Sequence, residues 1–421
     1  MRVAVIGAGI VGVTTAYELA ADGHAVTVFE RRNTVAAETS FANAGVIAPG
    51  YVTPWAAPGM PWKVMSQVFG RHAAVRFAGL PSLAQCRWMW RWWRACRPAV
   101  YRRNRSAMQT LAQYSRQRLS GLAQGLRLDF EQAQGCLVLL RSDRALAGAQ
   151  AGLKLLQELG VEHALVTPDR CRALEPGLNP QTELAGAIHL PHDGVGNCRQ
   201  FAHLLRAEAQ RLGAQFRFDH DVQTVLPGNA PGLQWRLRDR AGQAAFDAVV
   251  VCAGVQANAV LQGCGLKLPL TPVYGYSLTA PLRHHEAAAV GPHSALMDEK
   301  FKVALTRLGQ RVRVAGSAEL GGHPDRLNAA AVATLYKVLN DWFPGAAQLR
   351  DVQVWKGARP MLPDGPPVLG ASGATGVWLN LGHGSSGWAL SCGSARVLAD
   401  QIGGRSPGID LAGLGIARLR G

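Results

Sequence analysis

The 421-residue chain lacks the features that mark several classes of protein. It has no Cys-x-x-Cys motif and no cysteine–histidine spacing of a zinc site, so we expect no metal site. No apolar run reaches the ~18 residues of a transmembrane helix. Charged residues make up only 17% and hydrophobic residues 48%, which excludes disordered and fibrous proteins. Single cysteines in apolar surroundings, such as Cys252, are typical of a reducing compartment and predict a cytoplasmic protein.

Acidic residues are missing from a long stretch of the chain. Between Glu38 and Asp129 there are 90 residues without an aspartate or glutamate, yet this stretch carries 13 basic residues and six of the 11 tryptophans. It therefore accounts for most of the net charge of +16. A basic patch can face nucleic acid, an anionic membrane or acidic substrates. No helix-turn-helix, zinc or RNP signature supports a nucleic-acid-binding protein, which remains the least favoured of these alternatives.

The hydrophobic pattern predicts a βαβ unit at the start of the chain, with strand 2–6, helix 10–22 and strand 25–29. An irregular loop over 38–62 and a mainly helical segment over 63–125 follow. Further predicted helices cover 143–159, 198–212, 326–342 and 385–403. Predicted strands cover 135–140, 215–251, 271–280, 294–298, 303–307, 311–316, 367–370 and 377–380. The Pro191-His192-Asp193-Gly194 sequence predicts a turn.

A dinucleotide-binding pattern joins the first strand to the first helix. Gly7 permits the tight turn, Gly9 lets the backbone approach a pyrophosphate, and Gly12 lets helix and strand pack closely. Glu30 ends the next strand, where an acid accepts bonds from ribose hydroxyls. The alternative is an ordinary tight turn, and the pattern alone fits NAD or FAD equally well.

A second glycine-rich turn, Gly382-His383-Gly384-Ser385-Ser386-Gly387, precedes the last predicted helix. The positive end of a helix dipole here would favour the negative charge that a flavin gains at its N1/O2 edge on reduction. A plain loop between strand and helix is the other interpretation.

Several motifs, in order along the chain, resemble the bacterial FAD-dependent D-amino-acid dehydrogenases of the small-subunit type, within the D-amino-acid oxidase-like superfamily. The resemblance runs from residue 1 to about residue 405. It rests on Glu38–Gly45, Pro49-Gly50-Tyr51, Pro54–Gly59, Trp88-Met89-Trp90, Gly275–Thr279, Lys302–Arg307, Arg359-Pro360-Met361-x-Pro363-Asp364-Gly365 and Gly382-His383-Gly384.

The resemblance implies an α/β glutathione-reductase-type flavoprotein with two domains. A discontinuous Rossmann-like FAD domain would comprise 1–60, 141–175, 196–268 and 350–421. An α+β substrate domain with an antiparallel sheet would comprise 61–140, 176–195 and 269–349. FAD binding is expected to be noncovalent. The implied cofactor residues are Gly7, Gly9, Gly12, Glu30, Arg31, Ser40, Asn43, Ala44, Gly45, Val222, Ala253, Gly254, Gly357, Gly382, Gly384, Ser385 and Gly387.

The resemblance also implies a substrate site. Arg359 matches the arginine that clamps the substrate carboxylate, because a planar guanidinium fork fits that group. Tyr276 is expected as a second carboxylate contact or pocket wall, or else as an ordinary strand residue. Tyr51 would close the pocket, or pack in its loop. Lys302 would lie near the flavin or, as we slightly prefer, be a solvated sheet residue. His383 is the candidate for a covalent flavin link that has to be excluded.

The implied reaction is oxidation of a D-amino acid, with hydride transfer from Cα to flavin N5 and hydrolysis of the imino acid to a 2-oxo acid and ammonia. Electrons would pass to a quinone or another acceptor that is not oxygen. Rival substrates are D-hydroxyproline, proline, sarcosine and glycine, and a role as one subunit of a heteromeric enzyme stays open. Arginine with tryptophan is typical of a membrane interface, so we expect peripheral contact with an anionic membrane, on the cytoplasmic face of the inner membrane. The other interpretation packs this segment against the FAD domain.

Overall fold

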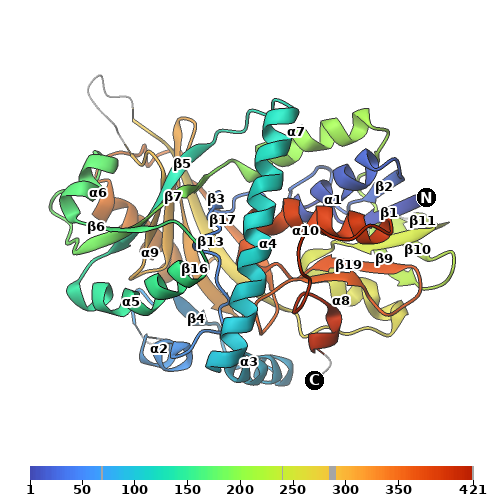
Figure 1. The fold of residues 1–421 in the computed structure, drawn as a ribbon, viewed down its shortest axis with the longest axis horizontal. Helices are drawn as coiled ribbons and strands as arrows, with labels where there is room; N and C mark the ends of the chain where they lie inside the picture. Colours follow the sequence, from blue (N-terminus) through green and yellow to red (C-terminus); the bar gives the residue numbers. More distant parts are fainter. Residues whose placement is uncertain (68–69, 239, 284–290, 420–421) are drawn as a thin grey trace.

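The computed structural model describes residues 1–419 apart from 68–69, 239 and 284–290. Its strands form two main sheets, one on each side of the view in Figure 1, and the long helix α4 (Pro98–Gly125) crosses the front between them. The predicted domain ranges and the helical segment include a few residues that lie outside the described ones.

The first sheet contains the amino-terminal strand. All its neighbouring strands are parallel except the edge pair β18 and β19. The central strands are buried on both faces, as continuous apolar runs such as AVVV require. In spatial order the strands are β18 (Val368–Ala371), β19 (Val377–Leu381), β12 (Ala248–Val251), β1 (Arg2–Ile6), β2 (Ala25–Phe29) and β8 (Gln215–Arg217).

Helices cover one face of this sheet and a small sheet covers the other. Glu18 ties the helical layer together, because its fully buried carboxylate accepts two bonds from Arg118 of α4 and one from Arg396 of α10. The helices are α1 (Ile10–Ala21), α7 (Cys198–Arg211) and α10 (Gly387–Ile402), with α4 packed on α10. The opposite face carries β9 (Asp221–Leu226), β10 (Gly232–Leu237), β11 (Arg240–Ala245), η1 (Gly254–Gln256), α8 (Ala257–Val260) and η2 (Leu261–Cys264).

The second sheet is mainly antiparallel. Helix α9 (Ala329–Trp342) packs on one of its faces. Its path runs through β17 (Gln353–Met361), β13 (Thr271–Pro281), β16 (Arg311–Leu320), β15 (Val303–Leu308), β14 (Ala295–Asp298), β5 (Ala133–Leu140), β7 (Gly186–Val195) and β3 (Val46–Ile47), with β4 (Val75–Phe77) on β16 and β6 (Ala164–Val166) on β7. The remaining elements are α2 (Met60–Gln67), α3 (Leu83–Ala95), α5 (Asp143–Glu158), α6 (Pro168–Leu174), η3 (Gly384–Ser386) and η4 (Ile416–Leu419).

The predicted fold class is confirmed, but the strand pairing departs from the predicted domain ranges. Strand β17 and strand β3 belong to the second sheet, although 350–421 and 1–60 were assigned to the FAD domain. Within 141–175, β6 pairs with β7 of the second sheet. Conversely α4, within 61–140, packs on α10. The predicted turn at Pro191–Gly194 is wrong, because these residues lie inside β7, where a register shift in the pairing with β5 accommodates them.

Candidate active site

A long cleft opens along the carboxyl ends of the first sheet. Its empty space, including the open mouth, is about 1020 Å³. It extends from Glu30 and Val222 past the first glycine turn to the turn before α10. The predicted cofactor residues that line it are Gly7, Gly9, Glu30, Arg31, Ser40, Val222, Ala253, Gly254, Gly382, Gly384 and Gly387.

The turn from β1 to α1 can be built only with glycine at its first and last positions. Gly7 has φ +97°, and a Cβ there would lie 2.8 Å from the carbonyl oxygen of Cys252. A Cβ at Gly12 would collide with the carbonyl oxygen of Gly7, so glycine there allows the helix to lie against the turn. Gly12 therefore shapes the cleft without lining it. A Cβ at Gly9 would make only an ordinary van der Waals contact, with the Ser40 hydroxyl at 3.6 Å, so nothing within the chain itself excludes a side chain there.

Glu30 stands at one end of the cleft. Its carboxylate accepts hydrogen bonds from the backbone N–H groups of Ala8 at 2.7 Å and Arg32 at 2.8 Å. Burial raises the pKa of this carboxyl and outweighs the effect of the two backbone donors. Each carboxylate oxygen has a second lone pair, so the group can still accept from ribose hydroxyls. Arg31 pairs with Glu38 at 2.5 Å, also on the cleft wall.

The segment after Glu38 joins the cleft to the second sheet. Ser40 lines the cleft, and its hydroxyl accepts from the Ile10 N–H at 3.1 Å at the start of α1. Asn43, Ala44 and Gly45 do not line the cleft. The Asn43 carbonyl accepts from Arg313 of β16 and the Ala44 carbonyl from Thr306 of β15, so these residues fix the segment on the sheet.

The second glycine turn closes the other end of the cleft. His383 is buried, its Nε2 lies 3.1 Å from the Ser394 hydroxyl, and burial lowers the pKa of the imidazole to about 3. The ring is therefore neutral at physiological pH. Gly384 has φ +56°, and a Cβ there would lie 2.6 Å from the Met361 sulfur. Ser385, in η3, does not line the cleft.

These features fit an extended dinucleotide. An acid stands at one end, the starts of α1 and η3 face the cleft, and the buried Asn380 side chain on its wall has an amide oxygen with no hydrogen-bond partner among the described residues. That acceptor suits an N–H or O–H donor of a ligand. A bound FAD would be held by the residues of the cleft wall and would supply the two-electron chemistry.

Arg359 lies on β17, next to Pro360 of the cleft wall. Its guanidinium crosses over Gly275 of β13, where any Cβ would collide with it, and donates to the Ser317 carbonyl at 2.9 Å. Within the described chain it makes no ion pair. Burial lowers its pKa to about 10, so the group stays charged at neutral pH. A guanidinium that is short of solvent and has no acidic partner has the charge and the geometry to bind a carboxylate.

Two predicted residues on the same sheet do not join Arg359 or a flavin. Tyr276 pairs opposite Lys356, and its hydroxyl bonds to Glu319, as does the Lys356 ammonium. The Lys356 ammonium also lies over the Tyr276 ring. Because side chains alternate along a strand, Tyr276 and Arg359 are on opposite faces, so the structure places Tyr276 as a strand residue and not beside Arg359. Gly357 makes room for the Trp355 ring instead of lining the cleft.

Tyr51 and Lys302 are brought together at a third place. The Tyr51 hydroxyl donates to Glu299 at 3.0 Å, and the Lys302 ammonium pairs with Glu299 and lies 3.3 Å from the Tyr51 oxygen. Burial alone would lower the pKa of Lys302, but Tyr51 and Glu299 raise it. Lys302 is thus not a freely solvated sheet residue. Within the described part of the chain, no side-chain hydrogen bond or ion pair links this cluster to Arg359 or to the cleft wall.

Sequence reasoning missed several residues of the cleft wall. Thr39, Glu38, His220, Asp221, Gln256 and Asn380 line it as well. Glu38 and Thr39 belong to a motif that was noticed, and His220 and Asp221 precede Val222, so adjacency was the available signal. Nothing in the local sequence pointed to Asn380 or to Ser317.

Comparison with known proteins agrees with this geometry. The DAO family model, described as FAD dependent oxidoreductase, matches residues 2–401. The chain therefore belongs to this family of FAD-dependent oxidoreductases. It is similar to the D-amino acid dehydrogenase of Cereibacter sphaeroides, with 44% identity over 99% of this chain and 95% of the relative. The protein of that name from Rhizorhabdus wittichii is 42% identical over 99% of this chain and 100% of its own length.

Solved structures show the same fold at low identity. Glycine oxidase from Geobacillus kaustophilus superposes with a TM-score of 0.77 and 21% identity, covering 99% of each chain. L-proline dehydrogenase from P. horikoshii gives 0.71 and 19%, covering 96% of this chain and 94% of that one. No helix among the described residues has the length and apolar character needed to cross a membrane.

Proposed function

We propose that this chain is a D-amino acid dehydrogenase, which oxidises D-amino acids to 2-oxo acids and ammonia with bound FAD. The observation that carries the proposal is the uncompensated Arg359 guanidinium beside the cofactor cleft. The relatives at 42–44% identity over nearly the whole chain carry the same name. A substrate carboxylate would supply the negative charge that pairs with the Arg359 guanidinium.

Arg359 has the chemistry to hold the substrate in one orientation. Its forked N–H groups would bind the carboxylate through two parallel bonds, which fixes Cα relative to the guanidinium. The Ser277 hydroxyl on the neighbouring strand is buried without a partner among the described residues, as is the Ser317 hydroxyl. These hydroxyls are candidate partners for further polar atoms of the substrate.

The bridge between Met361 and His383 brings the Arg359 strand to the second glycine turn. Substrate held by Arg359 would therefore lie close to the cofactor. In that position the Cα hydrogen would face the flavin that the cleft residues would hold. The second glycine turn supplies no general base, because its histidine, His383, is buried, has a lowered pKa and is hydrogen-bonded to Ser394. The substrate amine must lose its proton on binding or beforehand, and water then hydrolyses the imino acid product.

We further propose that electrons leave for a quinone or another acceptor that is not oxygen, and that the enzyme makes peripheral contact with the cytoplasmic face of an anionic membrane. The unequal charge distribution supports this, since the acid-free stretch carries most of the excess positive charge.

The test is turnover with a panel of D-amino acids, glycine, sarcosine, proline and D-hydroxyproline. Each substrate is assayed with oxygen and with a water-soluble quinone analogue, and ammonia and 2-oxo acid are measured as products. We expect D-amino acids with the quinone analogue to give the highest kcat/KM. Faster turnover of sarcosine, glycine or a proline would overturn the proposed substrate, and equal rates with oxygen would overturn the proposed acceptor.

A further inference from the structure

Exposed apolar side chains are concentrated on one part of the molecule. Of the thirteen large hydrophobic residues that are exposed in the described chain, seven lie between residues 62 and 93. Leu80 is 98% exposed, Leu83 80% and Trp62 75%. Isolated exposed hydrophobics are normal, but a concentration of this kind marks an interaction site. We call these seven residues the docking surface: Trp62, Met65, Phe77, Leu80, Leu83, Trp90 and Trp93.

Helix α3 supplies the centre of this surface. It begins with a capping box between Ser82 and Gln85, so the first turn is fixed. Its inner side is anchored by the buried Trp88, whose indole N–H donates to the Met361 carbonyl at 3.1 Å. Its outer side presents Trp90 and Trp93, which are 53% and 58% exposed. The two faces show that α3 is an amphipathic helix held in place with its apolar outer ridge left uncovered.

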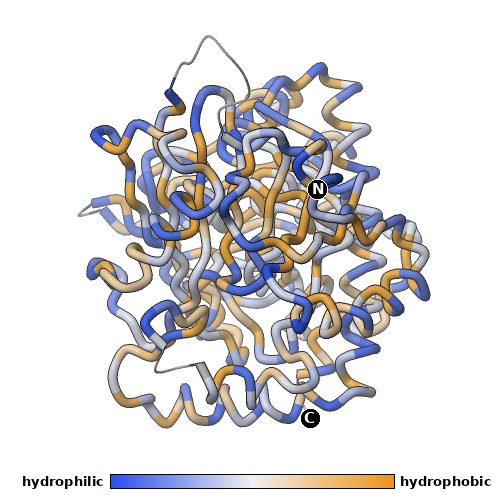
Figure 2. Tube along the Cα trace, turned by 90° about the vertical axis from the view of Figure 1, so that its left-hand side faces the viewer, coloured by the Kyte–Doolittle hydropathy of each residue, from blue (hydrophilic) through white to orange (hydrophobic). Residues whose placement is uncertain are grey.

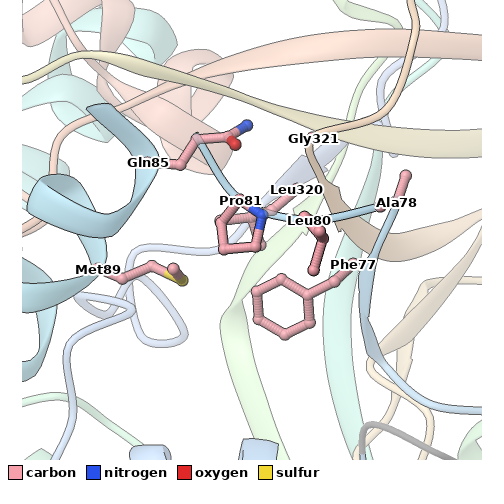
Figure 3. Close-up of a pocket in the computed structure, with 9 residues that line it drawn as sticks. Phe77, Ala78, Leu80, Pro81, Gln85, Met89, Leu320 and Gly321 are labelled. Atoms are coloured by element: carbon pink, nitrogen blue, oxygen red, sulfur yellow. The ribbon is translucent and has the colours of Figure 1, made fainter. Parts of the chain in front are cut away.

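The flanking segments extend the ridge. Figure 1 places α2, with Trp62 and Met65, at the same lower edge of the molecule as α3. Figure 3 shows the loop after β4 folded against α3, where Phe77, Leu80 and Pro81 face Met89 across a small pocket. The empty space of this pocket is about 210 Å³, including its opening. Figure 2 shows this lower edge from the side, with hydrophobic and hydrophilic stretches alternating along the chain.

Positive charge surrounds the apolar ridge. Eight basic side chains on these segments and on the start of α4 are exposed and make no ion pair in the described part of the chain. In contrast, Arg105 is buried and donates to the Gly50 carbonyl, and Arg118 pairs with Glu18. The packing interpretation thus holds for these two arginines and for Trp88. The exposed bases are Lys63, Arg71, Arg87, Arg91, Arg94, Arg97, Arg102 and Arg103.

We propose that the docking surface lies on an anionic lipid bilayer, with its apolar side chains inserted at the level of the headgroups and the eight bases around them. The proposal rests on the proposed function, because it names the surface through which the enzyme would meet a membrane-bound acceptor. Tryptophan and arginine suit this boundary, since each combines an apolar body with a polar or charged end. The guanidinium of Arg94 already lies 4.7 Å over the Trp90 ring.

Charge distinguishes a bilayer from the other possible occupants. A second copy of the chain seated face to face would bring two sets of eight uncompensated bases together. The phosphates of a nucleic acid would pair with the eight basic side chains but would leave Leu80, Leu83 and Met65 in water. An anionic bilayer would both neutralise the basic side chains and bury the apolar ridge.

Docking through α3 would also fix the active site relative to the membrane. The Trp88 bond reaches the carbonyl of Met361, two residues beyond Arg359 on the same strand. Strand β17, which carries Arg359, therefore lies directly behind α3, the helix that we place on the bilayer.

The test is cosedimentation of the FAD-loaded protein with vesicles of phosphatidylcholine containing phosphatidylglycerol, and with vesicles of phosphatidylcholine alone. We compare wild type with Trp90→Ser/Trp93→Ser and with Arg87→Ser/Arg91→Ser. The matched control is Leu165→Ser/Leu349→Ser, which alters two exposed apolar residues elsewhere, at 43% and 58% exposure. We expect the tryptophan pair to weaken binding at least about tenfold. The arginine pair should weaken it about twentyfold or more, since each base near an anionic surface contributes about fivefold. The control should bind like wild type.

The proposal would be overturned if the wild-type protein did not bind the anionic vesicles. It would also be overturned if Trp90→Ser/Trp93→Ser bound them as tightly as wild type. A dimer in lipid-free solution that the tryptophan pair converts to monomer would overturn it as well. Turnover with a water-soluble dye is measured in parallel and should be unchanged in all variants. Absence of turnover with D-amino acids in wild type would overturn the proposed function, whereas vesicle binding reports on the surface alone.

Discussion

Replacing Arg359 should strongly weaken recognition of the substrate carboxylate while leaving the fold intact. The guanidinium is half-buried, its protein bond goes to a neutral carbonyl, and no acid pairs with it among the described residues. Under the proposed function, the substrate carboxylate supplies the countercharge for Arg359. Removing one partner of a buried, hydrogen-bonded charge pair costs about 2–5 kcal/mol. We therefore expect Arg359→Met to lower kcat/KM for D-amino acids about 30- to 5,000-fold.

Two further variants sharpen this prediction. Arg359→Lys keeps the charge but loses the fork, so we expect an intermediate loss of about 10- to 150-fold, corresponding to one charge-assisted hydrogen bond. Arg307→Ala is the matched control, because Arg307 lies near the end of β15 on the same sheet and, among the described residues, its side chain bonds only to Gly309 and Gln310. A surface change of this kind should alter kcat/KM less than threefold, since its cost is about 0.5 kcal/mol.

The assay is steady-state kinetics with a dye acceptor, together with competitive inhibition by benzoate, a carboxylate without an amine. Benzoate affinity should fall by a factor similar to that for kcat/KM. The unfolding temperature of Arg359→Met should not fall below that of wild type, because an uncompensated, partly buried cation destabilises the fold. An unchanged kcat/KM, or a loss that tracks unfolding or loss of FAD, would refute the reasoning.

Three other predictions follow from the packing. Gly12→Ala should lower FAD affinity at least about tenfold in a fluorescence titration, since the new methyl group collides with the Gly7 carbonyl and displaces α1; wild-type affinity would contradict this. Burial raises the pKa of Asp193 to about 7, although the Gly50 N–H donates to its carboxylate. The folded state therefore holds the proton more tightly than the unfolded chain does. The stability that this proton contributes is fully present below about pH 4 and is lost as the pH rises through about 7. Asp193→Asn should therefore gain stability relative to wild type between pH 4 and 8, by up to about 4 kcal/mol in urea unfolding, and a pH-independent difference would count against it. Cys86, the one cysteine classed as exposed among the eight described thiols, should react fastest with a thiol reagent in the native protein and without loss of activity; fast reaction of several thiols would show that the buried ones are accessible.

Local pattern was sufficient for the cofactor half of the fold. The first strand, the glycine turn and the first helix interact through neighbours in sequence, so Gly7, Gly9 and Glu30 could be placed in one cleft before the structure was known. Element boundaries there agree within a residue or two, since strand β2 and helix α1 match the predicted 25–29 and 10–22 closely.

Long-range pairing was not predictable in the same way. Strand β17 contains Gly357 and Pro360, which weaken a strand pattern, and it is defined by its pairing with β13 about 80 residues earlier. The side on which Tyr276 points depends on the register of that pairing, which the sequence does not encode locally. The cluster of Tyr51, Glu299 and Lys302 likewise forms only when two segments about 250 residues apart come together.

Only the structure shows which arginines and tryptophans of the acid-free stretch are buried and which are exposed. Composition alone could not separate the buried Arg105 from the exposed Arg94, because helical spacing does not reveal which face of α3 or α4 finds a partner. The burial of Trp88 and the exposure of Trp90 and Trp93 turn a property of the whole segment into a defined surface.

The central claim is that this chain oxidises D-amino acids. It is tested most directly by mixing the FAD-loaded protein, without oxygen or another acceptor, with the D- and L-enantiomers of one amino acid in separate experiments. Loss of the visible absorbance of the flavin is followed in each. The account predicts rapid bleaching by the D-enantiomer and none by the L-enantiomer on the same time scale. Bleaching by the L-enantiomer alone, or by no D-amino acid of a broad panel, would contradict it.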